Sequence, residues 1–232
     1  MRHKKSKIAF ITLIVLIIVA AASFFIYVSQ YYKADDVTVA TIKASDSFEY
    51  HNNYVVFSSS TQTDDKALIF YPGGKVEYFA YFPLLEKLSQ NGIMCVLVKM
   101  PFNLAVFNIN AADEIINDFS NIDKWYIGGH SLGGAMASSY ASDNQDKIYG
   151  LILLGAYVYG DYPKDRSITI YGSNDTILKR SKVNYTENVF VIEGGNHAQF
   201  GNYGLQKGDG IAVISQERQQ DITEQYIVDF MK

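Results

Sequence analysis

Trp125-Tyr-Ile-Gly-Gly-His-Ser-Leu-Gly-Gly-Ala-Met-Ala137 is the stretch of sequence that decides the fold class. It reads as a buried strand, then the G-x-S-x-G of Gly129–Gly133, then a helix of small residues. In such a motif the serine lies on a sharp, strained turn, and the flanking glycines leave room where a Cβ would clash. The turn exposes the Ser131 hydroxyl and directs the Leu132 N–H toward a forming oxyanion. Ser131 is thus a candidate nucleophile and Leu132 a candidate oxyanion donor. Alternatively, the motif is only a tight glycine turn, in which Ser131 caps the helix that follows.

On both sides of this motif, short apolar runs alternate with segments of helical periodicity. We expect strands over 67–71, 93–98, 125–127, 148–154, 167–171 and 189–192, and helices over 77–91, 111–119, 132–141 and 215–231. Two further strands, over 37–42 and 54–57, are expected to begin the sheet in antiparallel fashion. Strands that are apolar throughout and separated by helices indicate an α/β fold, with a mainly parallel sheet covered on both faces. Ligands bind such sheets beyond the carboxyl ends of the strands.

A serine nucleophile needs a neighbouring base, and one histidine has the required position. Of the four histidines, only His197 follows Ser131, in a glycine-rich loop after the last predicted strand. The chain order nucleophile, acid, histidine requires an acid between them, and Asp175 follows the strand over 167–171. Asp175 would fix the imidazole tautomer. Glu193 and Asp161 are alternative acids; equally, Asp175 could be an Asx-turn residue and His197 could bond only its own loop.

A second oxyanion donor is expected in the loop after the strand over 67–71. That loop reads Tyr71-Pro-Gly-Gly-Lys75, and its two glycines let the backbone approach a ligand. We assign the donor to the Gly74 N–H, with Lys75 as the alternative by one step of register.

With these motifs the chain resembles the α/β-hydrolases, and it is similar in particular to the compact bacterial "fold-5" group, related to dienelactone hydrolase-like proteins. The resemblance runs from about Ala67 to the C-terminus. It rests on Tyr71-Pro-Gly-Gly-Lys-Val-Glu77, Lys99-Met-Pro-Phe-Asn-Leu-Ala105, Gly128-Gly-His-Ser-Leu-Gly-Gly134, Tyr171-Gly-Ser-Asn-Asp175 and Gly194-Gly-Asn-His-Ala-Gln-Phe-Gly201. The group implies a triad of Ser131, Asp175 and His197, no metal and no organic cofactor. Dienelactone hydrolases use a cysteine nucleophile where this chain has serine, so dienelactone hydrolysis is not implied.

Spacing around the motifs also predicts how the site is covered. The connection between the strands expected over 148–154 and 167–171 consists of residues 155–166 alone, and this segment is too short to form a lid domain. The site should be open, or covered by the loops over 100–110 and 198–210. In the first loop, Phe102, Leu104 and Phe107 would either line an acyl pocket or pack in the core. Lys99 is expected to be a solvated lysine rather than a contact for an anionic substrate.

Composition and charge narrow the possible functions. The chain has 232 residues, 48% hydrophobic, 19% charged and 14% aromatic, with 4 Pro, which excludes a disordered, collagen-like or polytopic membrane protein. Its single cysteine, Cys95, falls in a predicted buried strand and excludes a disulfide framework or a cysteine-rich zinc site. Residues 1–29 carry four basic and no acidic side chains, so the net charge of −4 leaves −8 on the rest. An acidic body argues against nucleic acid as a partner.

The N-terminus reads as a membrane anchor. A basic tail over 1–7 precedes the 21 uncharged residues 8–28, which as a helix would be about 31 Å long and match a hydrocarbon core. Residues 29–36 read as a tether and 37–232 as the hydrolase domain. Basic residues before the span place the N-terminus in the cytoplasm and the domain outside a single-pass cell-membrane protein. The alternative is cleavage at Ala20-Ala-Ala-Ser23 and secretion.

Together these features predict a serine hydrolase, carboxylesterase-like, that forms an acyl-enzyme on Ser131 and then hydrolyses it. Esters are favoured over amides because no subsite for a peptide or leaving amine is obvious. The expected substrate is a small-molecule or lipid-like ester. Two alternatives stay open: an acyltransferase to a cell-envelope hydroxyl, and a non-catalytic binding module on the same scaffold.

Overall fold

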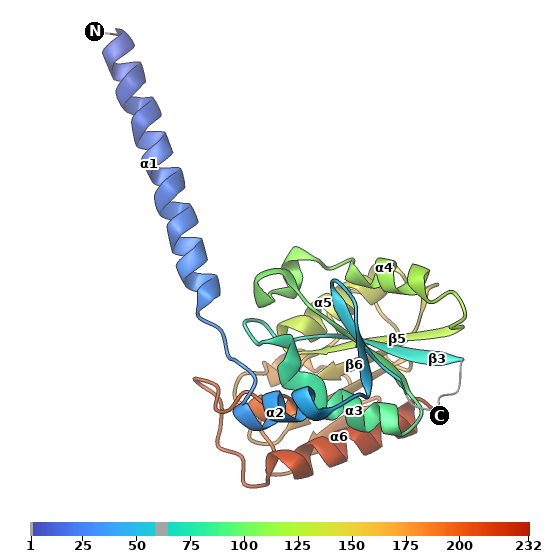
Figure 1. Cartoon of the computed structure of the whole chain (residues 1–232). Coiled ribbons are helices and arrows are strands. Elements are labelled where there is room, and N and C mark those ends of the chain that lie inside the picture. Colours follow the sequence, from blue (N-terminus) through green and yellow to red (C-terminus); the bar gives the residue numbers. More distant parts are fainter. Residues whose placement is uncertain (1, 59–64) are drawn as a thin grey trace. The chain divides into compact units, whose positions relative to one another are not determined.

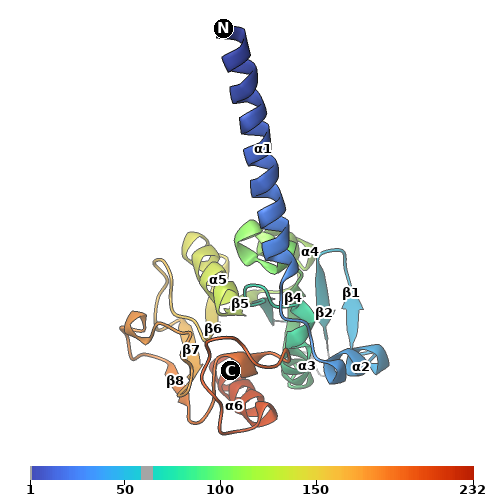
Figure 2. The same ribbon diagram turned by 90° about the vertical axis from the view of Figure 1, so that its left-hand side faces the viewer.

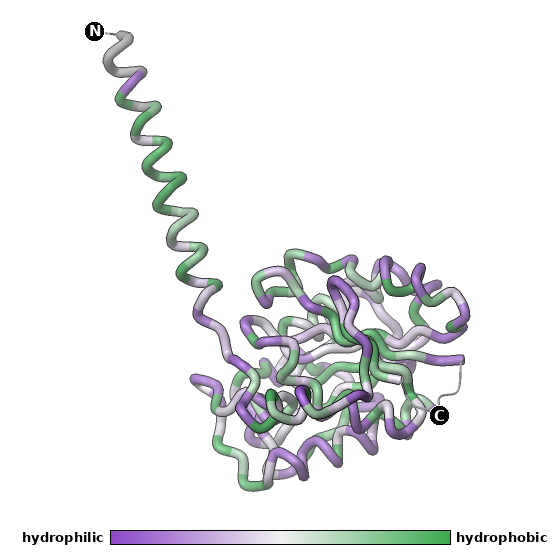
Figure 3. Tube along the Cα trace, in the orientation of Figure 1, coloured by the Kyte–Doolittle hydropathy of each residue, from purple (hydrophilic) through white to green (hydrophobic). Residues whose placement is uncertain are grey.

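The computed structural model of the chain describes residues 2–58 and 65–232, which form two compact units (Figure 1). The first unit ends at Tyr31 and consists of helix α1 (Arg2–Ser29). Its segment Phe10–Ser29 is long and apolar enough to be a membrane span or a signal sequence. Hydrophobic residues run along the middle and C-terminal part of α1 (Figure 3). The second unit begins at Tyr32 and carries the sheet.

The second unit is built on one eight-stranded sheet in the order β1-β2-β4-β3-β5-β6-β7-β8. Its strands are β1 (Phe48–Tyr50), β2 (Tyr54–Phe57), β3 (Lys66–Tyr71), β4 (Met94–Val98), β5 (Lys124–His130), β6 (Ile148–Leu154), β7 (Ser167–Gly172) and β8 (Val189–Ile192). Strands β3 to β8 are parallel, while β1 and β2 pair antiparallel at one edge. The predicted mainly parallel sheet is confirmed.

Helices cover both faces of this sheet (Figures 1 and 2). Helices α4 (Ala111–Asp118) and α5 (Leu132–Asp143) pack on one face, and α2 (Asp36–Ala44), α3 (Phe82–Gln90) and α6 (Gln216–Phe230) on the other. Each face has its own hydrophobic core. Leu68 and Phe70 of β3 point into one core and Ile69 into the other, which is why the strand reads as an apolar run without polar alternation.

Between these elements the described residues form five short 3-10 turns, at Tyr78–Tyr81, Pro101–Asn103, Ala105–Phe107, Arg180–Lys182 and Ala198–Phe200. The first of them occupies the start of the helix expected over 77–91, so α3 begins only at Phe82. Residues 155–166, which join β6 to β7, contain no helix, and no lid domain is inserted there.

One predicted strand is wrong. Residues 37–42 lie in helix α2 instead of a strand. The Asp35 side chain accepts the Thr38 N–H at 2.7 Å and caps this helix, and Thr38 and Ile42 are buried four residues apart on one face. Five of the six residues over 37–42 are β-branched, which gave this segment the appearance of a strand. The antiparallel edge is instead formed by β2, as expected, and by β1, which the sequence reading missed.

Candidate active site

The sheet reverses its strand order between β3 and β5, because β4 follows on one side of β3 and β6 on the far side of β5. In open α/β sheets the carboxyl edge at such a reversal is where ligands bind. The segment 73–77, here called the oxyanion loop, follows β3, and Ser131 directly follows β5. Asp175 and His197 lie in the loops after β7 and β8, so all the predicted site residues lie at this edge.

Ser131 lies on a strained turn. Its backbone has φ 52° and ψ −120°, a conformation that L residues rarely adopt and that costs on the order of 1–3 kcal/mol. Helix α5 begins at the next residue and approaches β3 closely: a Cβ at Gly133 would lie 2.2 Å from the carbonyl oxygens of both Tyr71 and Pro72. The second glycine of the motif is therefore required by the contact between helix and strand.

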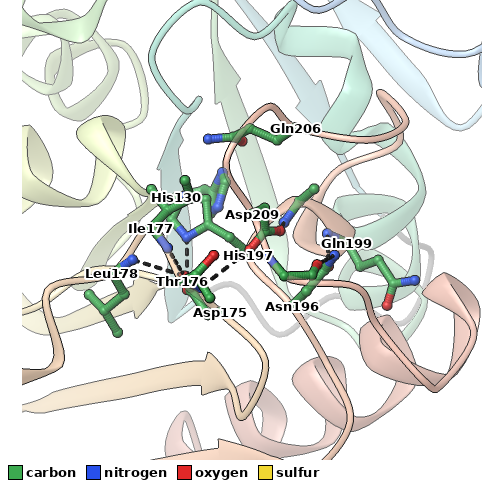
Figure 4. Close-up of polar contacts among 12 residues, drawn as sticks. His130, Asp175, Thr176, Ile177, Leu178, Asn196, His197, Gln199, Gln206 and Asp209 are labelled. Carbon is green, nitrogen blue, oxygen red and sulfur yellow. Dashed lines mark hydrogen bonds and ion pairs between the residues drawn. The ribbon is translucent and has the colours of Figure 1, made fainter.

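His197 and Asp175 form a buried pair (Figure 4). His197 Nδ1 lies 2.8 Å from Asp175 Oδ2, and each residue is 1% exposed. The other carboxylate oxygen, Oδ1, accepts the N–H groups of Ile177 and Leu178 at 2.9 and 2.8 Å. These bonds fix the carboxylate, which accepts the proton on Nδ1 and leaves the lone pair of the imidazole on Nε2. The alternative acids Glu193 and Asp161 are both exposed.

Nε2 of His197 is buried and has no hydrogen-bond partner within the described residues. The structure therefore has no hydrogen bond between it and the Ser131 hydroxyl. Both residues nevertheless line one cavity of about 310 Å³. In enzymes without bound substrate such a bond is often long and shortens only in the reacting complex.

In the oxyanion loop, four of the five backbone N–H groups are hydrogen-bonded. Gly73 donates to the Tyr81 hydroxyl, Lys75 to the Asn103 carbonyl, Val76 to the Gly73 carbonyl and Glu77 to the Tyr32 carbonyl. The Gly74 N–H makes no hydrogen bond to any part of the chain that the structure describes. Gly74 also faces the strained turn at Ser131 and Leu132, since a Cβ on Gly74 would lie 2.8 Å from Leu132 Cδ2. This geometry favours Gly74 over Lys75 as a free donor.

A buried chain of hydrogen bonds connects the oxyanion loop to His130, the residue before Ser131. The Tyr81 hydroxyl accepts the Gly73 N–H at 3.0 Å, so its own proton is donated to His130 Nδ1 at 2.8 Å. This direction places the proton of neutral His130 on Nε2, which is buried and has no hydrogen-bond partner among the described residues. Burial, and secondly the nearby His197, lower the pKa of His130 well below its ordinary value. The rings of His130 and His197 are 4.4 Å apart between centroids.

The cavity beside Ser131 has a mainly apolar wall. Besides Ser131 and His197 it is lined by Leu132, Ala135, Gly155, Ala156, Tyr157, Ile177, Leu178 and Lys179. Of the described residues that the sequence suggested for this role, Phe102, Leu104 and Phe107 are not part of the wall, nor is Lys99. Leu104 is buried, whereas Phe102 and Phe107 are 46% and 50% exposed.

Cys95 and the acidic residues form no metal-binding cluster within residues 2–58 and 65–232. Cys95 is buried in β4, and burial raises the pKa of its thiol. No three His, Cys, Asp or Glu side chains in that part of the chain lie close enough to hold a metal ion.

Comparison with known proteins gives the family of this chain. The sequence profile described as "Alpha/beta hydrolase family" matches residues 67–221, from β3 into α6. The chain belongs to the alpha/beta hydrolase family. No functionally curated protein matches it significantly.

Solved structures give the same fold for this α/β-hydrolase. It is similar to TT1662 from Thermus thermophilus, with a TM-score of 0.55 and 12% identity over 80% of this chain and 98% of that one. It is also similar to Est1E from Butyrivibrio proteoclasticus with bound ferulic acid, with a TM-score of 0.56 and 13% identity over 77% of this chain and 95% of that one. A third similar structure is a dienelactone hydrolase from Anabaena variabilis, with a TM-score of 0.53 and 13% identity over 76% of this chain and 90% of that one. At these identities the likeness shows the fold alone.

Several residues that shape the site of this α/β-hydrolase were missed by the sequence reading. Gly155 has φ 53°, and a Cβ there would lie 2.7 Å from His197 Nδ1. Tyr81 connects Gly73 with His130, as described above. Asp209 accepts the N–H of Ala198, the residue after His197, at 2.9 Å. None of these contacts is local in sequence, and a glycine has no reactive group, so no motif marked them in advance.

Proposed function

We propose that this α/β-hydrolase is a serine hydrolase that cleaves ester bonds through Ser131, His197 and Asp175. The observation that carries the proposal is the buried His197–Asp175 pair, whose unpartnered Nε2 belongs to a residue lining the same cavity as Ser131. A buried imidazole nitrogen without a partner is costly in a purely structural role. It is well suited to a base that must accept a proton during a reaction. His130 Nε2 is also buried without a partner among the described residues, but His130 does not line the cavity and its Nδ1 faces the Tyr81 hydroxyl instead of a carboxylate. The position and the partner of His197 therefore distinguish it.

Acylation begins when the Ser131 hydroxyl attacks the ester carbonyl carbon while His197 Nε2 takes the hydroxyl proton. Negative charge then develops on the carbonyl oxygen, and the N–H groups of Leu132 and Gly74 stabilise it. The C–O bond to the alcohol breaks, and His197 gives its proton to the departing oxygen. Water repeats the sequence on the acyl-enzyme, with His197 again as the base, and releases the acid and the free serine.

Asp175 supports this cycle without taking the proton. Its Oδ2 holds His197 Nδ1 in the tautomer that leaves Nε2 free, and its charge stabilises the imidazolium formed in each half-reaction. The N–H groups of Ile177 and Leu178 keep the carboxylate in place.

The cavity supports an ester with an apolar acyl or alcohol group, small-molecule or lipid-like, because most of its lining side chains are aliphatic or aromatic. We also propose that residues 8–28 form an uncleaved membrane anchor with the N-terminus in the cytoplasm and the domain, 37–232, outside the cell. The apolar character of α1 and the basic residues that precede the span support this assignment.

Labelling with a fluorophosphonate probe, which reacts with activated serines, tests the proposal. The wild-type chain should be labelled, whereas Ser131→Ala and His197→Ala should not, since one lacks the nucleophile and the other its base. Ser138→Ala is a matched control, because Ser138 is buried in α5 away from the cavity wall. Labelling that persists in Ser131→Ala would remove the nucleophile assignment.

A further inference from the structure

We propose that Tyr32 is a positioning residue for the reaction: the docking segment, Tyr32–Asp35, ties the oxyanion loop to the loop that follows His197. This inference rests on the proposed function. The docking segment belongs to the same compact unit as the sheet, and its role would make it part of the active-site architecture.

On one side the docking segment pairs with the oxyanion loop. The Tyr32 N–H donates to the Lys75 carbonyl at 2.7 Å, and the Tyr32 carbonyl accepts the Glu77 N–H at 2.8 Å, which forms a parallel bridge. Two residues later the Ala34 N–H donates to Glu77 Oε2 at 2.9 Å.

These bonds fix the residue next to Gly74. The N–H of Lys75 donates to the Asn103 carbonyl at 2.7 Å, and its carbonyl is held by Tyr32. Lys75 has φ 59°, so without these bonds the loop would tend to relax toward a more favourable backbone. Gly73, on the other side, is held by Tyr81. The direction of the free Gly74 N–H therefore depends on a pair of fixed neighbours, and Tyr32 holds one of them.

On the other side the docking segment holds the loop 202–209. The Tyr32 hydroxyl accepts the Lys207 N–H at 3.1 Å, its ring lies 5.5 Å from that of Tyr203, and the Asp35 N–H donates to the Asn202 carbonyl at 2.9 Å. This loop leads to Asp209, whose carboxylate accepts the Ala198 N–H beside His197. Tyr32 thus contacts both the segment that carries the second oxyanion donor and the segment that supports the base.

The contacts of Tyr32 with these two loops should influence the catalytic rate, because catalytic groups must be held within about 0.5 Å of their productive geometry. A displacement of about 1 Å can cost on the order of 100-fold in rate. The segments that Tyr32 connects contain no strand or α-helix of their own, so bonds from outside must fix them.

Ester hydrolysis by the full-length chain in detergent tests the inference, with Tyr32→Ala, Tyr32→Phe and the control Tyr31→Ala. Tyr32→Ala keeps the main-chain bonds to Lys75 and Glu77 but loses the ring contact and the hydroxyl that connect them to the loop 202–209. We expect kcat to fall about tenfold while KM changes less than about twofold. Tyr32→Phe keeps the ring and loses only the acceptor for Lys207, so a smaller fall in kcat is expected. Tyr31 is an exposed neighbour, and Tyr31→Ala should match the wild type.

Thermal unfolding of each variant is measured in parallel, and kcat is compared well below the lowest Tm. A Tyr32→Ala chain with a lower Tm and an unchanged kcat would show a merely structural role and overturn the inference. Should Tyr32→Ala fail to fold, an unchanged kcat in Tyr32→Phe overturns it instead. A wild-type chain that neither hydrolyses esters nor reacts with a fluorophosphonate would overturn the proposed function, and this inference with it.

Discussion

At the scale of single residues, the site depends on backbone positions where a side chain would be excluded. Gly133 allows α5 to approach β3, and Gly155 leaves the space that the His197–Asp175 pair occupies. Ser131 itself adopts a positive φ without being glycine. Strain of this kind persists only where the surrounding structure determines it, and it is concentrated at functional sites.

Gly155→Ala tests whether that space matters. The added Cβ would lie 2.7 Å from His197 Nδ1 and 3.3 Å from Asp175 Oδ2, and Gly155 has φ 53°. The imidazole must shift, and we expect kcat to fall about 100-fold or more. Gly92→Ala is the control for backbone strain, since Gly92 has φ 81° but lies before the amino end of β4. Equal losses of kcat in the two variants would contradict the explanation.

His130 should make stability depend on pH. The pKa of buried His130 lies well below its ordinary value of 6.5, so on acidification the unfolded chain binds a proton at this residue before the folded chain does. The contribution is fully present above about pH 6.5 and is lost as the pH falls below it, by at most about 1.4 kcal/mol per pH unit. Denaturant unfolding of wild type and His130→Gln between about pH 7.5 and 5 measures this, and the variant should have the shallower dependence. The same slope in both proteins would contradict it.

At the scale of elements, strands β2 to β8 were predictable, whereas strand β1 and the N-terminal helix of the domain were not. Strands β3 to β7 are largely buried on both faces, and their apolar runs mark them in the sequence. The edge strand β8 is only partly buried, yet its residues Val189–Ile192 are also all apolar. Residues 37–42 are rich in β-branched side chains, yet capping by Asp35 and packing of Ile42 determine a helix. Strand β1 has only three residues, two of them exposed, which leaves almost no pattern to read.

The residues of the site likewise divide into those that the sequence could predict and those that it could not. Ser131, Asp175 and His197 could be proposed from the sequence, because motifs and strand ends mark their positions. Tyr32, Tyr81 and Gly155 could not, because they contribute hydrogen bonds and space instead of reactive groups. Tyr81 and His130 are 49 residues apart. Only the folded chain brings such residues together.

Asp35→Ala tests the account of α2. The Asp35 side chain accepts the Thr38 N–H, so its loss should lower the free energy of unfolding by about 1 kcal/mol. Asp36→Ala removes an acidic group from the first turn without removing the cap, and a loss of only a few tenths of a kcal/mol is expected. Chemical denaturation measures both. Equal losses would show that charge, and not the cap, stabilises this helix.

At the scale of the whole molecule, the apolar helix and the hydrolase domain form separate units, and the proposed topology places the domain outside the cell. Protease treatment of intact cells should then release a fragment that contains the domain, while the same treatment leaves a cytoplasmic marker protein uncut. Protection of the domain until the cells are lysed would reverse the proposed orientation.

Trapping of the acyl-enzyme tests the central claim most directly. The full-length chain is mixed with an activated ester, quenched in acid and digested, and the peptides are analysed by mass spectrometry. We predict an acyl adduct on Ser131 in the wild type and its loss in His197→Gln. Hydrolysis that continues with the adduct on another residue, or with no dependence on His197, would contradict the claim.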